Sequence, residues 1–477
     1  WFVLSCAIKS VELRELLERT GQPVECHGRL LGQVEDISDD SRNLGPGSIF
    51  LATPQGLPYL EQAAHQQPLA LVVTPELRER ALSISLDSTN ILVVSDILHF
   101  QGILVTEWLE HPDQNLYLVG ITGTNGKTSV SFILQDIWQR AGVLWGRIGT
   151  LGVAWQGRSG RQQEKTGYTT PRLPQLCKIL KQMQSDGVTH VALEVSSEAL
   201  LLGRVANLTF AAAVFTNLTP DHLDVHGSME AYLATKLRIV RQSRKLVLDP
   251  AAPGAADFRK EAEARKVPLL ETRGHTLPFP VPIDFMRVNA LLGVLASGLP
   301  PLAVLTAMKS LPAVPGRASR IAVPGREELM GMVDYAQTPA ALESILSELR
   351  RSSMQKIVTV FGCGGDRDRL KRPLMGEVAG RLSDLVIVTD DNPRTEDAAT
   401  IRQEILRGCP SGNVREIADR RLAIREAVRW LLQQREKAVL LLAGKGHEEE
   451  QIVGNERFPF SDREELLQAL GASENSI

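Results

Sequence analysis

The stretch Thr122-Gly-Thr-Asn-Gly-Lys-Thr-Ser129 decides how the middle of this 477-residue chain folds. The largely apolar run Leu116–Ile121 precedes it and predicts a strand, and a helical pattern begins near Lys127. Gly123 and Gly126 allow the backbone to turn tightly, so that successive N–H groups can point at phosphate oxygens. The N-terminal dipole of the following helix would strengthen that attraction. We therefore predict a loop that binds the phosphates of ATP.

Two side chains of this loop have predicted roles in ATP chemistry. Lys127 can reach the β- and γ-phosphates, and the hydroxyl of Thr128 can hold Mg²⁺. The general pattern for such loops requires glycine at the position of Ile121, so the match is to a shortened variant. The alternative is an ordinary glycine-containing turn between a strand and a helix. On the first interpretation the ATP-binding residues are Gly123, Thr124, Asn125, Gly126, Lys127, Thr128 and Ser129.

The composition is typical of a water-soluble globular protein, with 43% hydrophobic and 23% charged residues. The net charge of −3 gives no electrostatic reason to expect nucleic acid or a membrane as partner. No apolar run approaches the ~20 residues that cross a bilayer, and the opening Trp1–Ile8 is too short for a membrane helix. We expect a cytoplasmic monomer, with a plastid as the alternative location; a leader could precede Trp1.

The cysteines have no paired or metal-binding spacing, so we expect buried thiols rather than disulfides or ligands. They are Cys6, Cys26, Cys177, Cys363 and Cys409.

Strands that alternate with helices predict an α/β fold with largely parallel sheets. At roughly 150 residues per domain, the length suggests about three domains. We place them at residues 1–112, 113–315 and 316–477, with the first boundary near His111-Pro112-Asp113. Residues 248–282, rich in Pro, Ala and Gly, are expected to be the least regular part. Further strand candidates are Ser48–Ala52, Leu69–Val73, His190–Val195, Ala211–Thr216, Leu329–Asp334, Lys356–Phe361, Leu385–Thr389 and Ala438–Ala443, and helix candidates are Pro339–Arg350 and Asp419–Gln434.

Carboxylates at strand ends are the further Mg²⁺ ligands that an ATP-binding loop needs. Glu194 ends the apolar run Val191–Leu193, and Asp221–His226 follows the predicted strand 211–216. Taken alone, each is more typical of a solvated strand end or a polar surface loop. Because open sheets gather ligands at the carboxyl ends of their strands, we treat both as candidates.

Three polar loops of the last segment also follow predicted parallel strands: Gly362–Arg369, Asp390–Arg394 and Gly444–Glu448. Such loops would converge in one crevice. Arginine binds a carboxylate bidentately and glutamate accepts from an ammonium group, so this set suits a zwitterion. The alternatives are a surface charge run for the first loop and an Asx-Pro turn for the second.

Taken together, these motifs resemble the Mur ligases, and within them the group that adds the third residue of the peptidoglycan stem peptide. The resemblance covers nearly the whole chain. It rests on Asp40-Ser41-Arg42, the 122–129 loop, Tyr168–Pro171, Leu193–Ser197, Phe215–Leu218, Asp221–Asp224, Lys236, Gly316-Arg317, Val333–Ala336 and the three polar loops.

The resemblance implies three domains: a small N-terminal α/β domain for the UDP moiety, a central P-loop ATPase with a mainly parallel sheet, and a C-terminal Rossmann-like domain for an amino acid. It also implies the reaction. ATP phosphorylates the γ-carboxylate of D-Glu in UDP-MurNAc-L-Ala-D-Glu, and an amino group attacks the acyl phosphate, giving an amide, ADP and phosphate. The implied cofactors are ATP and Mg²⁺.

By motif match, the resemblance assigns roles to individual residues. The implied catalytic residues are Lys127, Glu194, His222 and Lys236, and the implied metal site is Thr128, Glu194, His222 and Lys236, the last if carbamylated. The implied UDP-substrate residues are Ser41, Thr169, Thr170, Ser196 and Arg204, and the further nucleotide residues are Asn289, Arg317 and Asp334. From its local sequence alone, Lys236 would be a helix-surface lysine.

The loop Asp391-Asn392-Pro393-Arg394 resembles the form found in enzymes that use meso-diaminopimelate. That amino acid carries a distal carboxylate that lysine lacks, and Arg394 is its natural partner. Arg367, Asn392, Gly444 and Glu448 match the rest of this pocket.

Several positions differ from the family pattern: Glu198 for His, Leu202 for Gln, Thr219-Pro220 for Ser-Arg, Met286 for Asn and Gln337 for His. The changes at 198 and 202 are expected to weaken the contact with the dipeptide substrate. Two alternatives therefore stay open. One is a lysine-adding or folylpolyglutamate-type ligase of the same superfamily, and the other is a degenerate homologue that acts as a scaffold.

Overall fold

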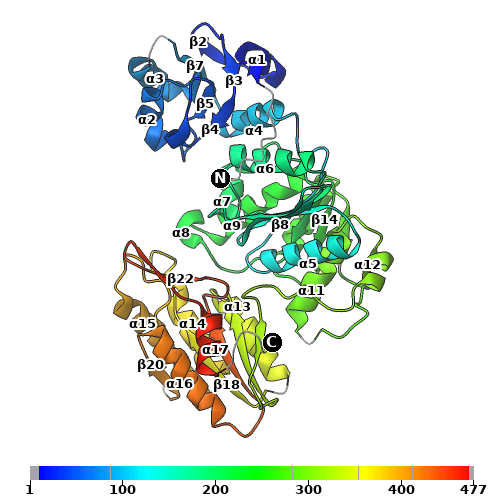
Figure 1. Cartoon of the computed structure of the whole chain (residues 1–477), viewed down its shortest axis with the longest axis vertical. Helices are drawn as coiled ribbons and strands as arrows, with labels where there is room; N and C mark the ends of the chain where they lie inside the picture. The colour runs from blue at the N-terminus through cyan, green and yellow to red at the C-terminus, as the bar shows by residue number, and fades with distance from the viewer. Residues whose placement is uncertain (1–9, 86–87, 282, 353, 411, 472–477) are drawn as a thin grey trace. The chain divides into compact units, whose positions relative to one another are not determined.

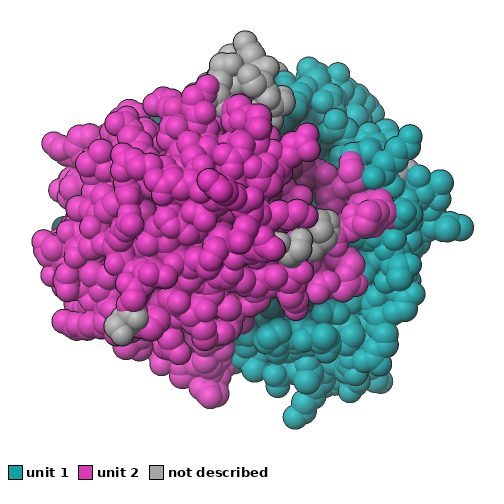
Figure 2. Space-filling view, turned by 90° about the horizontal axis from the view of Figure 1, so that it is seen from below, with its two compact units in different colours: residues 1–218, 233–278, 290–309 teal, residues 219–232, 279–289, 310–477 magenta. Residues whose placement is uncertain are grey.

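The computed structural model describes residues 10–85, 88–281, 283–352, 354–410 and 412–471. The chain forms two compact units (Figures 1 and 2). Unit 1 comprises residues 1–218, 233–278 and 290–309, and unit 2 comprises residues 219–232, 279–289 and 310–477. The predicted α/β class with mainly parallel sheets is confirmed, whereas the three domain boundaries stay a prediction. Within the described residues, no helix is both long and apolar enough to cross a membrane.

The first sheet of unit 1 has five strands in the order β2-β7-β6-β5-β4, and only the β2–β7 pair is antiparallel. Its strands are β2 (Glu25–His27), β4 (Asp36–Ser38), β5 (Ser48–Leu51), β6 (Ala70–Val73) and β7 (Asn90–Val93), and its helices are α1 (Leu13–Thr20), α2 (Leu60–His65), α3 (Arg78–Ile84) and α4 (Ile97–Trp108). The short strands β1 (Val11–Glu12) and β3 (Gln33–Val34) pair separately. The strands predicted at 48–52 and 69–73 are confirmed.

The second sheet of unit 1 has eight strands in the order β11-β10-β9-β12-β8-β13-β14-β15, and all pairs from β9 to β15 are parallel. Its strands are β8 (Tyr117–Thr122), β9 (Trp145–Gly149), β10 (Gly152–Gly157), β11 (Gly160–Glu164), β12 (His190–Glu194), β13 (Ala212–Phe215), β14 (Leu246–Leu248) and β15 (Leu269–Glu271). Its helices are α5 (Lys127–Arg140), α6 (Leu173–Ser185), α7 (Ser197–Leu201), α9 (Met229–Leu237), α10 (Ala255–Ala264), α11 (Asp284–Ala296) and α12 (Pro301–Ala307). The first residues of α9, up to 232, and of α11, up to 289, belong to unit 2. Since β8 lies between β12 and β13, the loop after β8 adjoins the ends of both neighbours.

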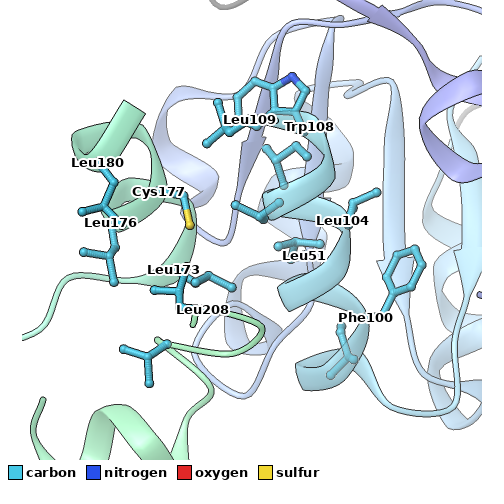
Figure 3. Close-up of a cluster of buried hydrophobic side chains, with 14 of the residues drawn as sticks. Leu51, Phe100, Leu104, Trp108, Leu109, Leu173, Leu176, Cys177, Leu180 and Leu208 are labelled. Atoms are coloured by element: carbon cyan, nitrogen blue, oxygen red, sulfur yellow. The ribbon is translucent and has the colours of Figure 1, made fainter. Parts of the chain in front are cut away.

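The two sheets of unit 1 share one hydrophobic core, which Figure 3 shows between α4 and α6. Buried side chains from the first part of the unit are Leu51, Phe100, Leu104, Trp108 and Leu109, and those from the second part are Leu173, Leu176, Cys177, Leu180 and Leu208. Ion pairs of Lys178 with Asp36 and of Arg172 with Asp39 flank this core. The core therefore holds the start of α6, directly after Thr170-Pro171, against the first sheet.

The sheet of unit 2 has six strands in the order β16-β17-β21-β18-β19-β20, and all but β16 are parallel. Its strands are β16 (Ser319–Ala322), β17 (Leu329–Asp334), β18 (Lys356–Phe361), β19 (Leu385–Val388), β20 (Val414–Glu416) and β21 (Ala438–Ala443), and a hairpin of β22 (Glu450–Val453) and β23 (Glu456–Pro459) follows. Its helices are α8 (Leu223–His226), α13 (Pro339–Arg351), α14 (Lys371–Leu382), α15 (Ala398–Leu406), α16 (Arg420–Leu432) and α17 (Asp462–Ala469). Alternate strand residues pack against α13–α15 on one face and against α16 and α17 on the other, as in the Rossmann-like domain that the resemblance implies.

Two expectations from the sequence need correction. Residues 248–282 are more regular than predicted, because Gly254 starts α10 in a left-handed conformation and Phe258 of that helix stacks on Phe215 at 3.8 Å. The strand β15 then pairs with β14. Among the cysteines in the described residues, Cys177 and Cys363 are buried but Cys26 is exposed. Cys6, the opening Trp1–Ile8 and Pro282 lie outside the described residues.

A buried ion pair joins the starts of α16 and α17 to the end of β21. Arg420 donates to both carboxylate oxygens of Asp462 at 2.7 Å and to the carbonyl of Ala443 at 3.0 Å, and both charged side chains are fully buried. The loop Gly444–Glu448 begins at the next residue, so this pair fixes its starting point.

We predict that Asp462→Ala destabilises unit 2 by about 3–5 kcal/mol, because it leaves a buried guanidinium without a counter-ion. The measurement is hydrogen–deuterium exchange of peptides from α16 and α17, together with urea denaturation. Glu343→Gln, which alters the exposed ion pair of Glu343 with Arg381 in the same unit, serves as the control and should change stability by no more than about 0.5 kcal/mol. Equal protection in the two variants would contradict the prediction.

Candidate active site

The loop between β8 and α5 is a tight glycine turn directly before the helix. Gly123 and Gly126 have φ values of 141° and 89°, which side chains other than glycine rarely adopt. A Cβ atom on Gly123 would lie 1.9 Å from the hydroxyl oxygen of Thr216, so there is no room for one. The backbone N–H groups of Thr124 and Asn125 are held by the carbonyl and side chain of Asn217, at 2.8 and 3.1 Å. The end of β13 thus braces the loop.

Two lysines bring positive charge to this loop. Lys127, the first residue of α5, folds back so that Nζ donates to the carbonyls of Gly123 and Thr124 at 2.8 and 2.9 Å. Lys236 on α9 reaches the carbonyl of Gly123 at 3.1 Å, and its side chain is buried. The interpretation of Lys236 as a helix-surface lysine is therefore wrong, because α9 packs that residue against the loop.

The carboxylate of Glu194, at the end of β12, is fully buried beside the loop. It accepts hydrogen bonds from the hydroxyls of Thr128 at 2.9 Å, Thr150 at 3.0 Å and Ser131 at 3.3 Å. Gly149 leaves space for it, since a Cβ there would lie 2.0 Å from a Glu194 oxygen. A buried carboxylate needs such donors to offset its lost hydration.

Ser131 and Thr150 were not among the predicted site residues, although each had a signal in the sequence. Ser131 lies three positions after Thr128, so the two hydroxyls share one face of α5. Thr150 follows β9, whose parallel neighbour is β12, and it therefore lies at the same edge of the sheet as Glu194.

Four of the five predicted UDP-substrate residues lie around the backbone of Glu194. The hydroxyl of Thr170 donates to the carbonyl of Glu194 at 2.8 Å and accepts from the N–H of Ser196 at 3.1 Å. The hydroxyls of Thr169 and Thr150 lie 3.1 Å apart. Arg204 donates to the carbonyl of Thr170 at 3.1 Å. A chain of hydrogen bonds thus joins Arg204 to the phosphate loop.

The fifth residue, Ser41, lies in the part of unit 1 that contains the five-stranded sheet. Its side chain is buried, and its hydroxyl donates to Gln62 at 3.1 Å. The structure shows no hydrogen bond from Ser41 to the Thr170–Arg204 group. Arg172, which donates to the carbonyl of Asp39 at 3.1 Å, is one of the links between the two parts. Burial raises the pKa of Asp39, and the charge of Arg172 opposes that rise.

The remaining nucleotide-side candidates and His222 belong to unit 2. Asp334 is buried, accepts from the N–H of Ala318 at 2.7 Å, and has its pKa raised by burial, which the charge of Arg317 opposes. The guanidinium of Arg317 lies 4.2 Å from the ring centre of Tyr335. Asn289 is buried on α11. His222 has a φ of 55° and lies 3.4 Å from the carboxylate of Asp221.

Across the residues that the structure covers, no group of three or more His, Cys, Asp or Glu side chains is placed to hold a metal ion.

The three polar loops of unit 2 meet at Asn392, as predicted. Its side-chain carbonyl accepts from Lys445 Nζ and from the N–H of Ile452, both at 3.0 Å, and its amide donates to Glu448 at 2.8 Å. Lys445 is fully buried and also lies 3.2 Å from Glu448. The backbone carbonyl of Asn392 accepts from the N–H of Gly365 at 2.9 Å, so this buried residue is bonded to both of the other polar loops. The sequence pattern Gly-Lys-Gly carried no signal that Lys445 would be buried.

The carboxylate of Glu448 lies in an acidic, partly enclosed environment. Burial, with the neighbouring Asp391 as a second cause, raises the pKa of Glu448. One oxygen of Asp391 is buried without a hydrogen-bond partner, and Gly444 lies next to it with a φ of 106°.

The carbonyl of Gly444 accepts from Gln337 at 3.0 Å, so the unusual residue at 337 has a defined contact. Burial raises the pKa of Tyr335 to about 12.

Arg394 has a left-handed backbone conformation, with a φ of 51°. The β22–β23 hairpin holds it there, through the N–H of Arg394 to Ile452 O at 3.1 Å and the N–H of Gly454 to Arg394 O at 2.7 Å. The guanidinium donates to the carbonyl of Gly365 at 2.7 Å. Arg367 is exposed and donates to Asp366 O at 3.0 Å, so it is not joined directly to the Asn392 cluster.

Comparisons with known proteins agree over most of the chain. Residues 121–276 match the Mur ligase middle domain, and residues 316–446 match the glutamate ligase domain of Mur ligases. The chain is 38% identical to a UDP-N-acetylmuramoyl-L-alanyl-D-glutamate–2,6-diaminopimelate ligase of Leptospira borgpetersenii, with 92% of this chain and 94% of the relative covered. The ligase of the same name from Agrobacterium fabrum is 37% identical, with 98% and 97% covered.

Solved structures give the same result. A structure of a ligase with that same name matches with a TM-score of 0.65 and 28% identity, covering 97% of this chain and 99% of that one. The folylpolyglutamate synthase of Mycobacterium tuberculosis shares the fold, with a TM-score of 0.58 at 16% identity over 71% of this chain and 91% of that one. These similarities extend over nearly the full length of the ligase relatives, and the chain belongs to the Mur ligase family.

Proposed function

We propose that this protein is an ATP-dependent amide ligase that joins meso-diaminopimelate to UDP-MurNAc-L-Ala-D-Glu. The observation that carries the proposal is that one chain contains two different sites, one in each unit. Unit 1 has a glycine loop with Glu194 bonded to Thr128, and unit 2 has Arg394, Glu448 and Asn392 gathered at the ends of parallel strands. The relatives that bear this ligase name support the choice of substrates.

The proposed reaction has two steps, and a carboxylate needs both because it is a poor electrophile. In the first step, an oxygen of the D-Glu γ-carboxylate attacks the γ-phosphorus of ATP, the bond to the β-phosphate oxygen breaks, and ADP leaves. In the second step, the amine of the amino acid attacks the acyl carbon, loses a proton and expels phosphate. The charge of Lys127, on the rim of the loop, would stabilise the transferring phosphoryl group.

The residues beside the loop fit Mg²⁺ in part. Thr128 and Glu194 offer oxygen atoms 2.9 Å apart, and Mg²⁺ prefers one or two carboxylates together with substrate phosphates. Bound there, Mg²⁺ would neutralise charge on the phosphates. Lys236 has the wrong charge as an ammonium group and would serve as a ligand only as a carbamate. The imidazole of His222 is less suited to Mg²⁺ than oxygen ligands are.

For the amino acid, the proposed pocket offers both signs of charge. Arg394 would bind the distal carboxylate, and Glu448 would accept from an ammonium group. Lys445 and Asn392 hold the carboxylate of Glu448 in place. We propose that Gly444 and Arg367 complete this pocket, and that the chain works in the cytoplasm on soluble precursors. Asn289, Arg317 and Asp334 are proposed for the nucleotide side, and Ser41, Thr169, Thr170, Ser196 and Arg204 for the UDP substrate.

We predict that Lys127→Ala lowers kcat for amino-acid-dependent phosphate release by about 10²–10³-fold, because a charge that stabilises the transition state is lost. The assay contains ATP, Mg²⁺, UDP-MurNAc-L-Ala-D-Glu and diaminopimelate. Lys181→Ala, which removes a surface lysine paired with Glu110, should keep the wild-type rate. A wild-type rate in Lys127→Ala, with an unchanged circular dichroism spectrum, would refute the role of the loop.

We predict that Arg394→Lys lowers kcat/KM for diaminopimelate by about 30-fold or more, because a charge-assisted bidentate contact worth about 2–3 kcal/mol is lost. The rate with lysine as acceptor should stay as low as in the wild type. Arg407→Lys, at an exposed position on the same unit, is the control. Release with lysine alone in the wild type would overturn the choice of amino acid, and release with neither would favour a scaffold.

A further inference from the structure

The side chain of Arg204 in unit 1 is nearly buried, whereas the carboxylate that pairs with it is exposed to solvent. Its side chain is 6% exposed, whereas that of its partner Glu198 is 54% exposed. The guanidinium donates through Nη1 to Thr170 O at 3.1 Å and through Nη2 to Glu198 Oε1 at 3.0 Å. Its centre lies 5.1 Å from the ring centre of Tyr168. The Nε atom is buried and has no hydrogen-bond partner.

Glu198 therefore satisfies only half of one guanidinium edge. Nε and Nη2 form the side of the guanidinium that can bind a carboxylate with two parallel hydrogen bonds. Glu198 engages Nη2 and leaves Nε unpaired. A buried cation without a counter-ion is strongly unfavourable, so Arg204 requires an anion at this edge. A second carboxylate that engaged both atoms would be a better partner than Glu198.

Glu198 loses little free energy when another carboxylate replaces it as the partner of Arg204. Its carboxylate is more than half exposed, so it regains hydration when it swings away from Arg204. The other terminal nitrogen of the guanidinium, Nη1, stays bonded to the carbonyl of Thr170. Thr170 is in turn bonded to the carbonyl of Glu194 at 2.8 Å. Arg204 can thus release Glu198 without losing its position relative to the phosphate loop.

We propose that Glu198 is a built-in counter-ion of Arg204 that a carboxylate of the UDP-dipeptide substrate displaces on binding. This inference rests on the proposed function and adds a positioning residue to it. Glu198 keeps Arg204 in place while the site is empty, and it competes with the substrate for the same guanidinium edge. The sequence alone suggested a simple loss of contact at position 198, whereas the ion pair indicates competition.

The test is Glu198→Gln, which keeps the size of the side chain and an oxygen acceptor but removes the charge. We expect KM for UDP-MurNAc-L-Ala-D-Glu to fall about two- to fivefold, with kcat and KM for ATP unchanged. Binding of the same compound, measured by calorimetry without ATP, should tighten by the same factor. Glu61→Gln is the matched control, because its carboxylate is 59% exposed and pairs with Arg80 at 2.8 Å.

A double-mutant cycle separates competition from a purely structural role. In an Arg204→Met background, Glu198→Gln should leave the dissociation constant of the UDP-dipeptide unchanged, because no guanidinium remains to compete for. An unchanged or higher KM in Glu198→Gln, in an active enzyme, would overturn the inference and leave the proposed function intact. A wild-type chain that neither binds this compound nor turns it over would overturn both.

Discussion

The buried carboxylate of Glu194 is the constraint on which the active part of unit 1 depends. Three hydroxyls, from Thr128, Ser131 and Thr150, are directed at it. Its own backbone carbonyl binds Thr170, which in turn holds Arg204. A buried carboxylate is costly unless its oxygens are satisfied, so α5, the end of β9 and the 168–172 segment must keep their positions around β12. The phosphate loop and the residues proposed for the UDP substrate are thereby held in one frame.

In unit 2, too, a buried hydrogen-bond network holds the site residues in place, but other side chains form it. Asn392 bonds to the Gly444–Glu448 loop through its side-chain amide and to the Gly362–Arg369 loop through its backbone carbonyl, and the buried Lys445 completes the network. Arg420 and Asp462 fix the end of β21 from the other side. The hydrogen bonds of this buried network hold the groups at its edge, while one oxygen of Asp391 and Nη1 of Arg420 are buried without a partner. The groups at this edge are Arg394 and Glu448, whose charges suit the two ends of an amino acid with a distal carboxylate.

The residues that differ from the family pattern make defined contacts of their own. Gln337 donates to Gly444, Glu198 pairs with Arg204, and Met286 packs against the core of unit 2. None of these three side chains is an isolated polar group in an apolar site.

The sequence by itself determined the α/β class, the glycine turn between β8 and α5 and most of the strands, including Lys356–Phe361 and Ala438–Ala443 to the residue. These depend on local periodicity and on glycines in positive-φ turns, which neighbouring residues encode. Only the tertiary structure decided that Lys236 and Lys445 are buried and that Thr150 donates to Glu194. Those outcomes depend on which strands lie side by side and in which register. Pairing of that kind joins residues tens of positions apart, and no local pattern records it.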